Sequence, residues 1–98
     1  MPLDFDQTFK ALADAKRRKI LVLLQKQDLT AGEIAQEFEI SKPSISHHLK
    51  ILKNANLVEA RRDGQQIYYS LQMTVFQEVV SQFMNLFKQE GSENGEEI

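Results

Sequence analysis

Several side chains between residues 41 and 66 are hydrogen-bond donors or cations, and their chemistry suits contact with double-stranded DNA. In chain order they are Lys42, Ser44, Ser46, His47, Lys50, Arg61, Arg62, Gln65 and Gln66. Ammonium and guanidinium groups neutralise phosphates. Hydroxyl, imidazole and amide groups can hydrogen-bond to a phosphate or to the edge of a base. The arrangement of these residues therefore depends on the elements that carry them.

The pattern predicts one helix over residues 41–56. Ser41 is a good N-cap, and Pro43 fits the first helical turn. Successive helical residues are rotated by about 100°. Ile45 therefore shares a buried side with Leu49, whereas Lys50 and the other polar residues point away from it. A polar helix face is often merely solvated, but the neighbouring segments favour DNA contact here.

The two adjacent histidines are expected to differ in role. His47 falls on the outward side and can reach a base edge or a phosphate. His48 falls beside the apolar side, so we expect it to pack and hydrogen-bond within the fold. Their side chains diverge by about 100° on a helix, so they cannot jointly hold one metal ion.

A shorter helix and a tight turn are predicted just before this helix. Thr30 and Glu33 have the spacing of a capping box, which opens a helix with an apolar side around Ile34. Glu39 and Ile40 then form the turn. Helix, tight turn and capped helix is the order of a helix-turn-helix motif.

A β-hairpin is predicted after the motif. Residues 57–62 and 66–71 are strand-like and flank Asp63-Gly64, a strong turn signal. The hairpin would project Arg61, Arg62, Gln65 and Gln66 from a stiff ribbon toward phosphate or a minor groove. The two arginines alternate faces, so the sequence leaves open which of them contacts DNA.

Helices are also predicted at both ends of the chain. Phe5 and Phe9 share one face of a first helix, and Asp14 is a plausible N-cap for a second. The second helix opens with the basic run 16–19, which either binds phosphate or is simply solvated. The last helix has a broad apolar stripe of Phe76, Val79, Val80, Phe83 and Phe87. We expect this last helix to pack against a second copy of the chain.

Length and charge fit a small DNA-binding domain. With 98 residues the chain allows one domain, which we place at 1–89, followed by an acidic disordered tail at 90–98. The net charge is −2, yet between Lys42 and Arg62 the only acidic residue is Glu59. Local charge governs attraction to DNA because salt screens beyond about 8–10 Å. No export signal or membrane-length apolar run is apparent, so we expect a cytoplasmic protein without membrane insertion.

The residues that carry these patterns resemble the ArsR family of winged-helix repressors. The matching positions are Phe9 to Asp14, Arg17 to Leu21, Ser44 to Leu49, Leu52, Ala55, Leu57, Val58, Arg61, Arg62, Gly64 and Tyr68 to Leu71. Residues 41–49 and 67–71 resemble the SdpR-type autorepressors of that family. The resemblance implies a winged helix-turn-helix of the α+β class, mainly α, with about five helices and a two-stranded wing. It further implies a homodimer that is joined by its first and last helices, Phe5 and Phe9 included. Such a dimer would bind an imperfect palindrome and repress transcription, often of its own operon.

The chain departs from the metal-sensing members of that family. It has no cysteine, and the last helix has no histidine. Thiolates and neutral imidazoles are the ligands that such metals need, so we expect no metal site and no cofactor.

Two other classes of function fit the sequence less well. A winged-helix adaptor that binds protein instead of DNA should have an acidic or apolar outward face over residues 42–50, which this chain lacks. No arrangement of catalytic residues indicates an enzyme. The operator, the regulated genes and the inducing signal stay open, and that signal can be an anti-repressor protein or a small molecule.

Overall fold

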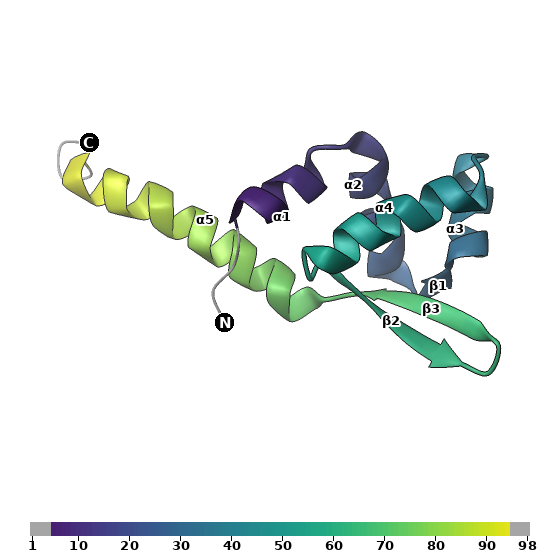
Figure 1. Ribbon diagram of the computed structural model, residues 1–98. Helices are drawn as coiled ribbons and strands as arrows, with labels where there is room; N and C mark the ends of the chain where they lie inside the picture. The colour runs from purple at the N-terminus through teal and green to yellow at the C-terminus, as the bar shows by residue number, and fades with distance from the viewer. Residues whose placement is uncertain (1–4, 95–98) are drawn as a thin grey trace.

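Over residues 5–94 the chain forms five helices and three short strands, and the last helix projects from the rest (Figure 1). The computed structural model describes the backbone of residues 5–94 and the side chains of residues 6–88. The elements are α1 (Phe5–Leu12), α2 (Ala15–Lys26), β1 (Leu29–Thr30), α3 (Ala31–Phe38), α4 (Lys42–Asn54), β2 (Val58–Asp63), β3 (Gln66–Leu71) and α5 (Met73–Asn94). This is the expected winged helix-turn-helix, with α3 and α4 as the motif and β2 and β3 as the wing.

The core fixes how α4 is rotated about its axis. Ile45, Leu49 and Leu52 of α4 are buried with side chains from α2, α3 and the start of the wing. The further members of this core include Ile20, Leu21, Leu24, Ile34, Leu57 and Val58. The predicted apolar side of α4 is therefore confirmed, and its polar side is left facing outward.

Local capping explains where the motif helices begin and end. The Thr30 hydroxyl accepts from the Glu33 backbone N–H at 3.1 Å, and the Glu33 carboxylate accepts from the Thr30 N–H at 2.9 Å. Glu39 ends α3 in the left-handed conformation, with φ 57°. The Ser41 hydroxyl then accepts from the Ser44 N–H and opens α4. The predicted capping box and N-cap are both confirmed.

The sheet has one strand more than the sequence predicted. β1 pairs with β3, so the order is β1-β3-β2, and Thr30 lies opposite Tyr68. Two residues are too few to show strand alternation, so β1 could not be predicted from its own residues.

The turn of the wing lies one residue later than predicted. Asp63 pairs with Gln66, so the loop is Gly64-Gln65 instead of Asp63-Gly64. Gly64 has φ +68°, which suits the first position of a type II′ turn.

Helix α5 extends further than the sequence predicted. Its backbone is helical as far as Asn94, whereas a disordered tail was expected from Glu90. Adding a turn to an existing helix is easier than starting one, so a polar segment can continue it. The remainder of the expected tail, residues 95–98, lies outside the described residues. The long helix contributes to a largest dimension of 57 Å.

Replacing Thr30 by alanine should lower the free energy of unfolding by about 1 kcal/mol, because the Glu33 N–H loses its acceptor. Urea denaturation followed by circular dichroism measures this change. Thr30→Ser is the control, since it keeps the hydroxyl and should cost less. An alanine variant as stable as the wild type would show that the cap is dispensable.

Candidate nucleic-acid interface

The outward face of α4 carries polar side chains that the fold itself uses little. Lys42, Ser44, Ser46, His47 and Lys50 are all exposed. The Ser44 hydroxyl accepts from that of Ser41 at 3.1 Å. Within the described part of the chain, Lys42, Ser46 and Lys50 make no side-chain hydrogen bond or ion pair. Their donors are therefore available to a ligand.

A groove joins α4 to the wing. Lys42 and Ser46 border it from α4, and Gln65 and Gln66 border it from the turn and β3. Its volume is about 310 Å³, and Ile67 lies on its wing side. The fold thus brings four of the predicted contact residues, from two distant segments, to one hollow in the surface.

The two wing arginines lie on opposite faces and differ in their surroundings. Arg61 lies opposite Tyr68, and Arg62 lies opposite Ile67. The Arg61 guanidinium donates to Asp28 Oδ2 at 2.9 Å and lies 5.4 Å from the Tyr68 ring centre. Arg62 has no ion pair among the described residues. Because cross-strand partners share a face, Arg62 lies on the face of Ile67, which borders the groove.

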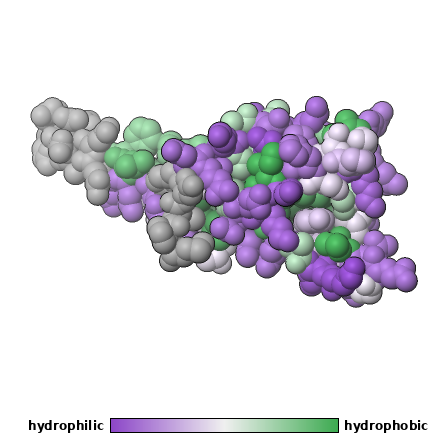
Figure 2. Space-filling view, viewed as in Figure 1, coloured by the Kyte–Doolittle hydropathy of each residue, from purple (hydrophilic) through white to green (hydrophobic). Residues whose placement is uncertain are grey.

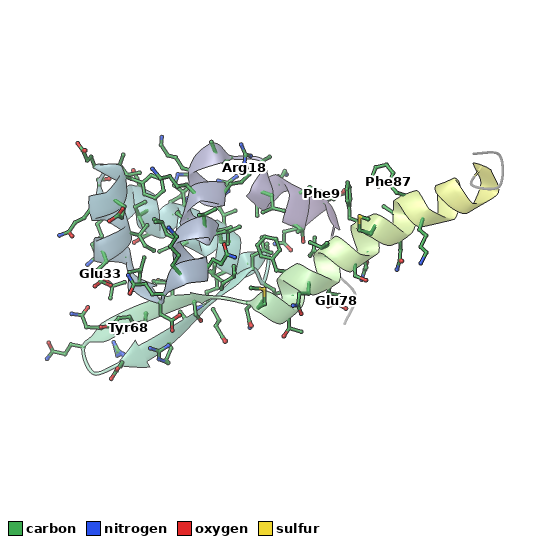
Figure 3. All side chains as sticks on the ribbon, turned by 180° about the vertical axis from the view of Figure 1, so that it is seen from behind. Phe9, Arg18, Glu33, Tyr68, Glu78 and Phe87 are labelled. Atoms are coloured by element: carbon green, nitrogen blue, oxygen red, sulfur yellow. The ribbon has the colours of Figure 1, made fainter. Side chains whose placement is uncertain are left out.

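The basic run at the start of α2 has structural roles that the sequence did not indicate. Arg18 Nη1 donates to the Leu12 carbonyl at 2.7 Å, at the end of α1 (Figure 3). Lys19 Nζ lies 5.2 Å from the centre of the Phe38 ring. Arg17 donates to the Lys10 and Ala11 carbonyls. The last carbonyls of a helix lack partners within it, and arginines satisfy them here. Arg17 and Arg18 are therefore more than a solvated face, since both donate to carbonyls at the end of α1.

His48 packs and hydrogen-bonds within the fold, as predicted. Its ring is half-buried, and Nδ1 lies 3.3 Å from Arg17 Nη1. A guanidinium can only donate, so Nδ1 accepts and the ring carries its proton on Nε2. Burial lowers the pKa of His48 below its usual value, the Asp14 carboxylate opposes this change, and the Arg17 charge adds to it. The neutral ring is thus the favoured form.

Asp14 caps α2 directly beside these groups. Its carboxylate accepts from the backbone N–H groups of Lys16 at 2.8 Å and Arg17 at 3.2 Å. The hydrogen bond from the Arg17 backbone N–H, more than any other interaction, holds the pKa of Asp14 below its ordinary value. A carboxylate therefore stands near the contact between Arg17 and His48.

An apolar surface covers the projecting part of α5. Val80, Phe83, Met84 and Phe87 are between 40% and 59% exposed. Figure 2 shows hydrophobic side chains gathered over this part of the helix. In Figure 3, Phe9 and Phe87 lie on one side of α5 and Glu78 on the other.

Part of the predicted dimer set is used inside the protomer instead. The Phe9 and Phe83 rings meet edge to face with centres 5.8 Å apart. Phe76 packs against the core, and Val79 is only 4% exposed. Val79 is therefore buried by its own chain, which corrects the expectation that it faces a second copy. The predicted contribution of Phe5 lies outside the described side chains.

The described residues contain no group of side chains that could hold a metal ion. Over this part of the chain no three histidine, aspartate or glutamate side chains come together as a metal site would require. Nor does any helix here have the length and hydropathy needed to cross a membrane.

Comparison with known proteins identifies the family. Residues 14–60 match the model of the bacterial regulatory proteins of the arsR family. The chain is 55% identical over 80 residues to the transcriptional repressor SdpR of Bacillus subtilis (strain 168), covering 82% of this chain and 89% of that protein.

Solved structures share the fold. An ArsR-like transcriptional regulator from Rhodococcus sp. RHA1 matches with a TM-score of 0.85 at 24% identity, over 92% of this chain and 85% of that one. HlyU from Vibrio cholerae N16961 matches with a TM-score of 0.68 at 30% identity, over 83% and 88%. The fold, the matched motif and the extent of the likeness to SdpR agree, and the chain therefore belongs to the arsR family of DNA-binding bacterial regulatory proteins.

Proposed function

We propose that this chain acts as a homodimer that binds a palindromic DNA operator and represses transcription, including transcription of its own gene. The observation that carries the proposal is the groove between α4 and the wing, where Lys42, Ser46, Gln65 and Gln66 meet. A helix of α4's width fits a major groove, and the wing then lies over the neighbouring backbone. Repression is supported by the likeness to SdpR, which is named a transcriptional repressor.

Each side chain has a proposed role that follows from its chemistry. Lys42, Lys50 and Arg62 bind phosphates, and His47 reads a base edge near the middle of α4. The hydroxyls of Ser44 and Ser46 and the amides of Gln65 and Gln66 supply directional hydrogen bonds. Arg61 contributes less because Asp28 already pairs with it.

The exposed face of α5 supports the homodimer. Val80 and Met84 are 51% and 59% exposed on the part of α5 that projects from the rest of the described chain. A second copy that packs its α1 and α5 on this face would remove those side chains from water. Two-fold symmetry would then place the two α4 helices about one or more DNA turns apart, roughly 34–36 Å per turn.

Neither catalysis nor metal sensing forms part of the proposal. The chain has no cysteine, and both of its histidines lie on α4, where they diverge. An anti-repressor protein or a small molecule is the proposed kind of inducing signal. The protein acts in the cytoplasm, together with the DNA that it binds.

The proposal predicts specific binding to the DNA upstream of the chain's own gene. Fluorescence anisotropy should give tighter binding to that duplex than to a scrambled one, with or without a chelator. Lys50→Ala should weaken binding to both duplexes alike and reduce the slope of log affinity against log salt by about one. His47→Ala should mainly reduce the preference for the true operator. Equal affinity of the wild type for both duplexes would refute an operator-specific repressor.

The two wing arginines should contribute unequally. Arg62→Ala should cost about 1.5 kcal/mol of operator affinity, the size of a hydrogen bond to a charged group. Arg61→Ala is the matched control and should cost less, because its guanidinium is paired with Asp28. The opposite order in an anisotropy titration would assign the DNA contact to Arg61.

The dimer should depend on the open flank of α5. Val80→Glu should shift the protein to monomer in sedimentation velocity, because a buried unpaired carboxylate is strongly unfavourable. Asn85→Glu adds the same charge at an exposed position on the opposite side of α5 and should leave the dimer intact. A Val80→Glu protein that still sediments as a dimer would move the interface elsewhere.

A further inference from the structure

One side chain connects the end of α1 to the proposed DNA-reading helix. Arg17 Nε donates to the Ala11 carbonyl at 2.7 Å, and Nη2 donates to the Lys10 carbonyl at 2.9 Å. The remaining nitrogen, Nη1, lies 3.3 Å from His48 Nδ1 on α4. The guanidinium is planar and rigid, so these three contacts fix α1 and α4 relative to one plane.

A cavity lies beside this connection. Its volume is about 520 Å³, and it is bordered by Asp6, Gln7 and Lys10 from α1 and by Ile51 and Asn54 from α4. Arg17 also lines it. The hydrogen bonds of Arg17 therefore lie at the edge of this cavity and link the two helices beside it.

The other side of α1 faces α5. Phe9 of α1 meets Phe83 of α5 with ring centres 5.8 Å apart, and Phe83 meets Phe87 at 5.1 Å. A continuous series of contacts thus runs from the apolar face of α5 through α1 and Arg17 to His48. His48 is the immediate neighbour of His47, whose side chain is exposed on the outward face.

We infer that Arg17 is a positioning residue for DNA binding: it sets the orientation of α4 against α1 and so couples the α1–α5 pair to the DNA-reading face. This inference rests on the proposed function, in which α4 reads the operator. Arg17 itself need not touch DNA, because its donors are directed at the two carbonyls and at the imidazole.

The contact with His48 makes this coupling sensitive to protonation. The charged groups around the ring are Asp14, Lys16 and Arg17 from α2, and Asp6 and Lys10 border the adjacent cavity from α1. His47, next along α4, is the other titratable group near the ring. A protonated His48 has no acceptor for Arg17 and repels it. Because burial lowers the pKa of His48, the contact is present at neutral pH and is lost as pH falls through that lowered pKa.

A double-mutant cycle on the full chain tests the inference. Operator affinity is measured by anisotropy for wild type, Arg17→Gln, His48→Leu and the double variant. Each single change should weaken binding about ten-fold, and the double change should be no worse than the singles, because both remove the same coupling. Arg18→Gln is the matched control. It removes the same charge from the same helix, and among the described residues Arg18 bonds only to the Leu12 carbonyl. The affinity of this variant should therefore stay within about two-fold of the wild type.

Two further variants each keep part of the contact between Arg17 and His48. They distinguish a positioning role of Arg17 from a role in folding. Thermal unfolding of every variant identifies those that are folded. Arg17→Lys keeps the charge without the three-way fork and should also lose affinity. His48→Asn places an amide oxygen near the position of Nδ1 and does not titrate. It should retain affinity near neutral pH and, unlike the wild type, keep it as the pH falls through the lowered pKa of His48. Comparing the two proteins at each pH cancels the contribution of His47.

The outcomes separate the inference from the proposed function. If the wild type fails to prefer its operator, the proposed function fails first. If the wild type binds its operator but folded Arg17→Gln and Arg18→Gln bind equally well, or if the two single changes are additive, Arg17 does not position α4. Loss of affinity in Arg17→Gln, with a double variant no weaker than the singles, supports the coupling.

Discussion

The burial of Ile45, Leu49 and Leu52 fixes the rotation of α4, and the rest of the surface chemistry depends on it. A turn of the helix by one residue, about 100°, would expose large side chains worth roughly 1.5–3 kcal/mol each and push polar ones into the core. The fold therefore has one stable choice of outward face. Lys50 and its polar neighbours lie on that face because three aliphatic side chains occupy the other.

The positions of the cations show why a count of basic residues overstates the surface available to a polyanion. Arg17 and Arg18 satisfy carbonyls at the end of α1, Arg61 pairs with Asp28, and Lys19 lies over Phe38. Each of these interactions joins two residues of the same chain. A surface pair such as Arg61 with Asp28 contributes little to stability, with exposed fractions of 53% and 42%, yet it still directs that guanidinium away from the groove.

Features that depend on neighbours in the sequence could be predicted, and those that depend on distant partners could not. The capping box at Thr30, the N-cap at Ser41 and the inward side of α4 follow from spacing alone. Strand β1 exists only because β3 passes beside it. The same is true of the site: the outward set on α4 followed from helical periodicity, whereas the roles of Arg17, Arg61 and Val79 depend on atoms far along the chain.

Pairing between β1 and β3 has a mechanical consequence for the wing. Thr30 both caps α3 and lies opposite Tyr68, so the root of the wing is a three-stranded sheet joined to the motif. Toward Gly64 the wing has only two strands, which twist and bend more easily than a wider sheet. The tip of the wing is thus more flexible than its base, where β1 pairs with β3. Lengthening the chain at Gly64 would change its reach along a duplex while leaving α3 and α4 undisturbed, whereas a residue inserted between Thr30 and Glu33 would break the capping box at the point where β1 joins α3.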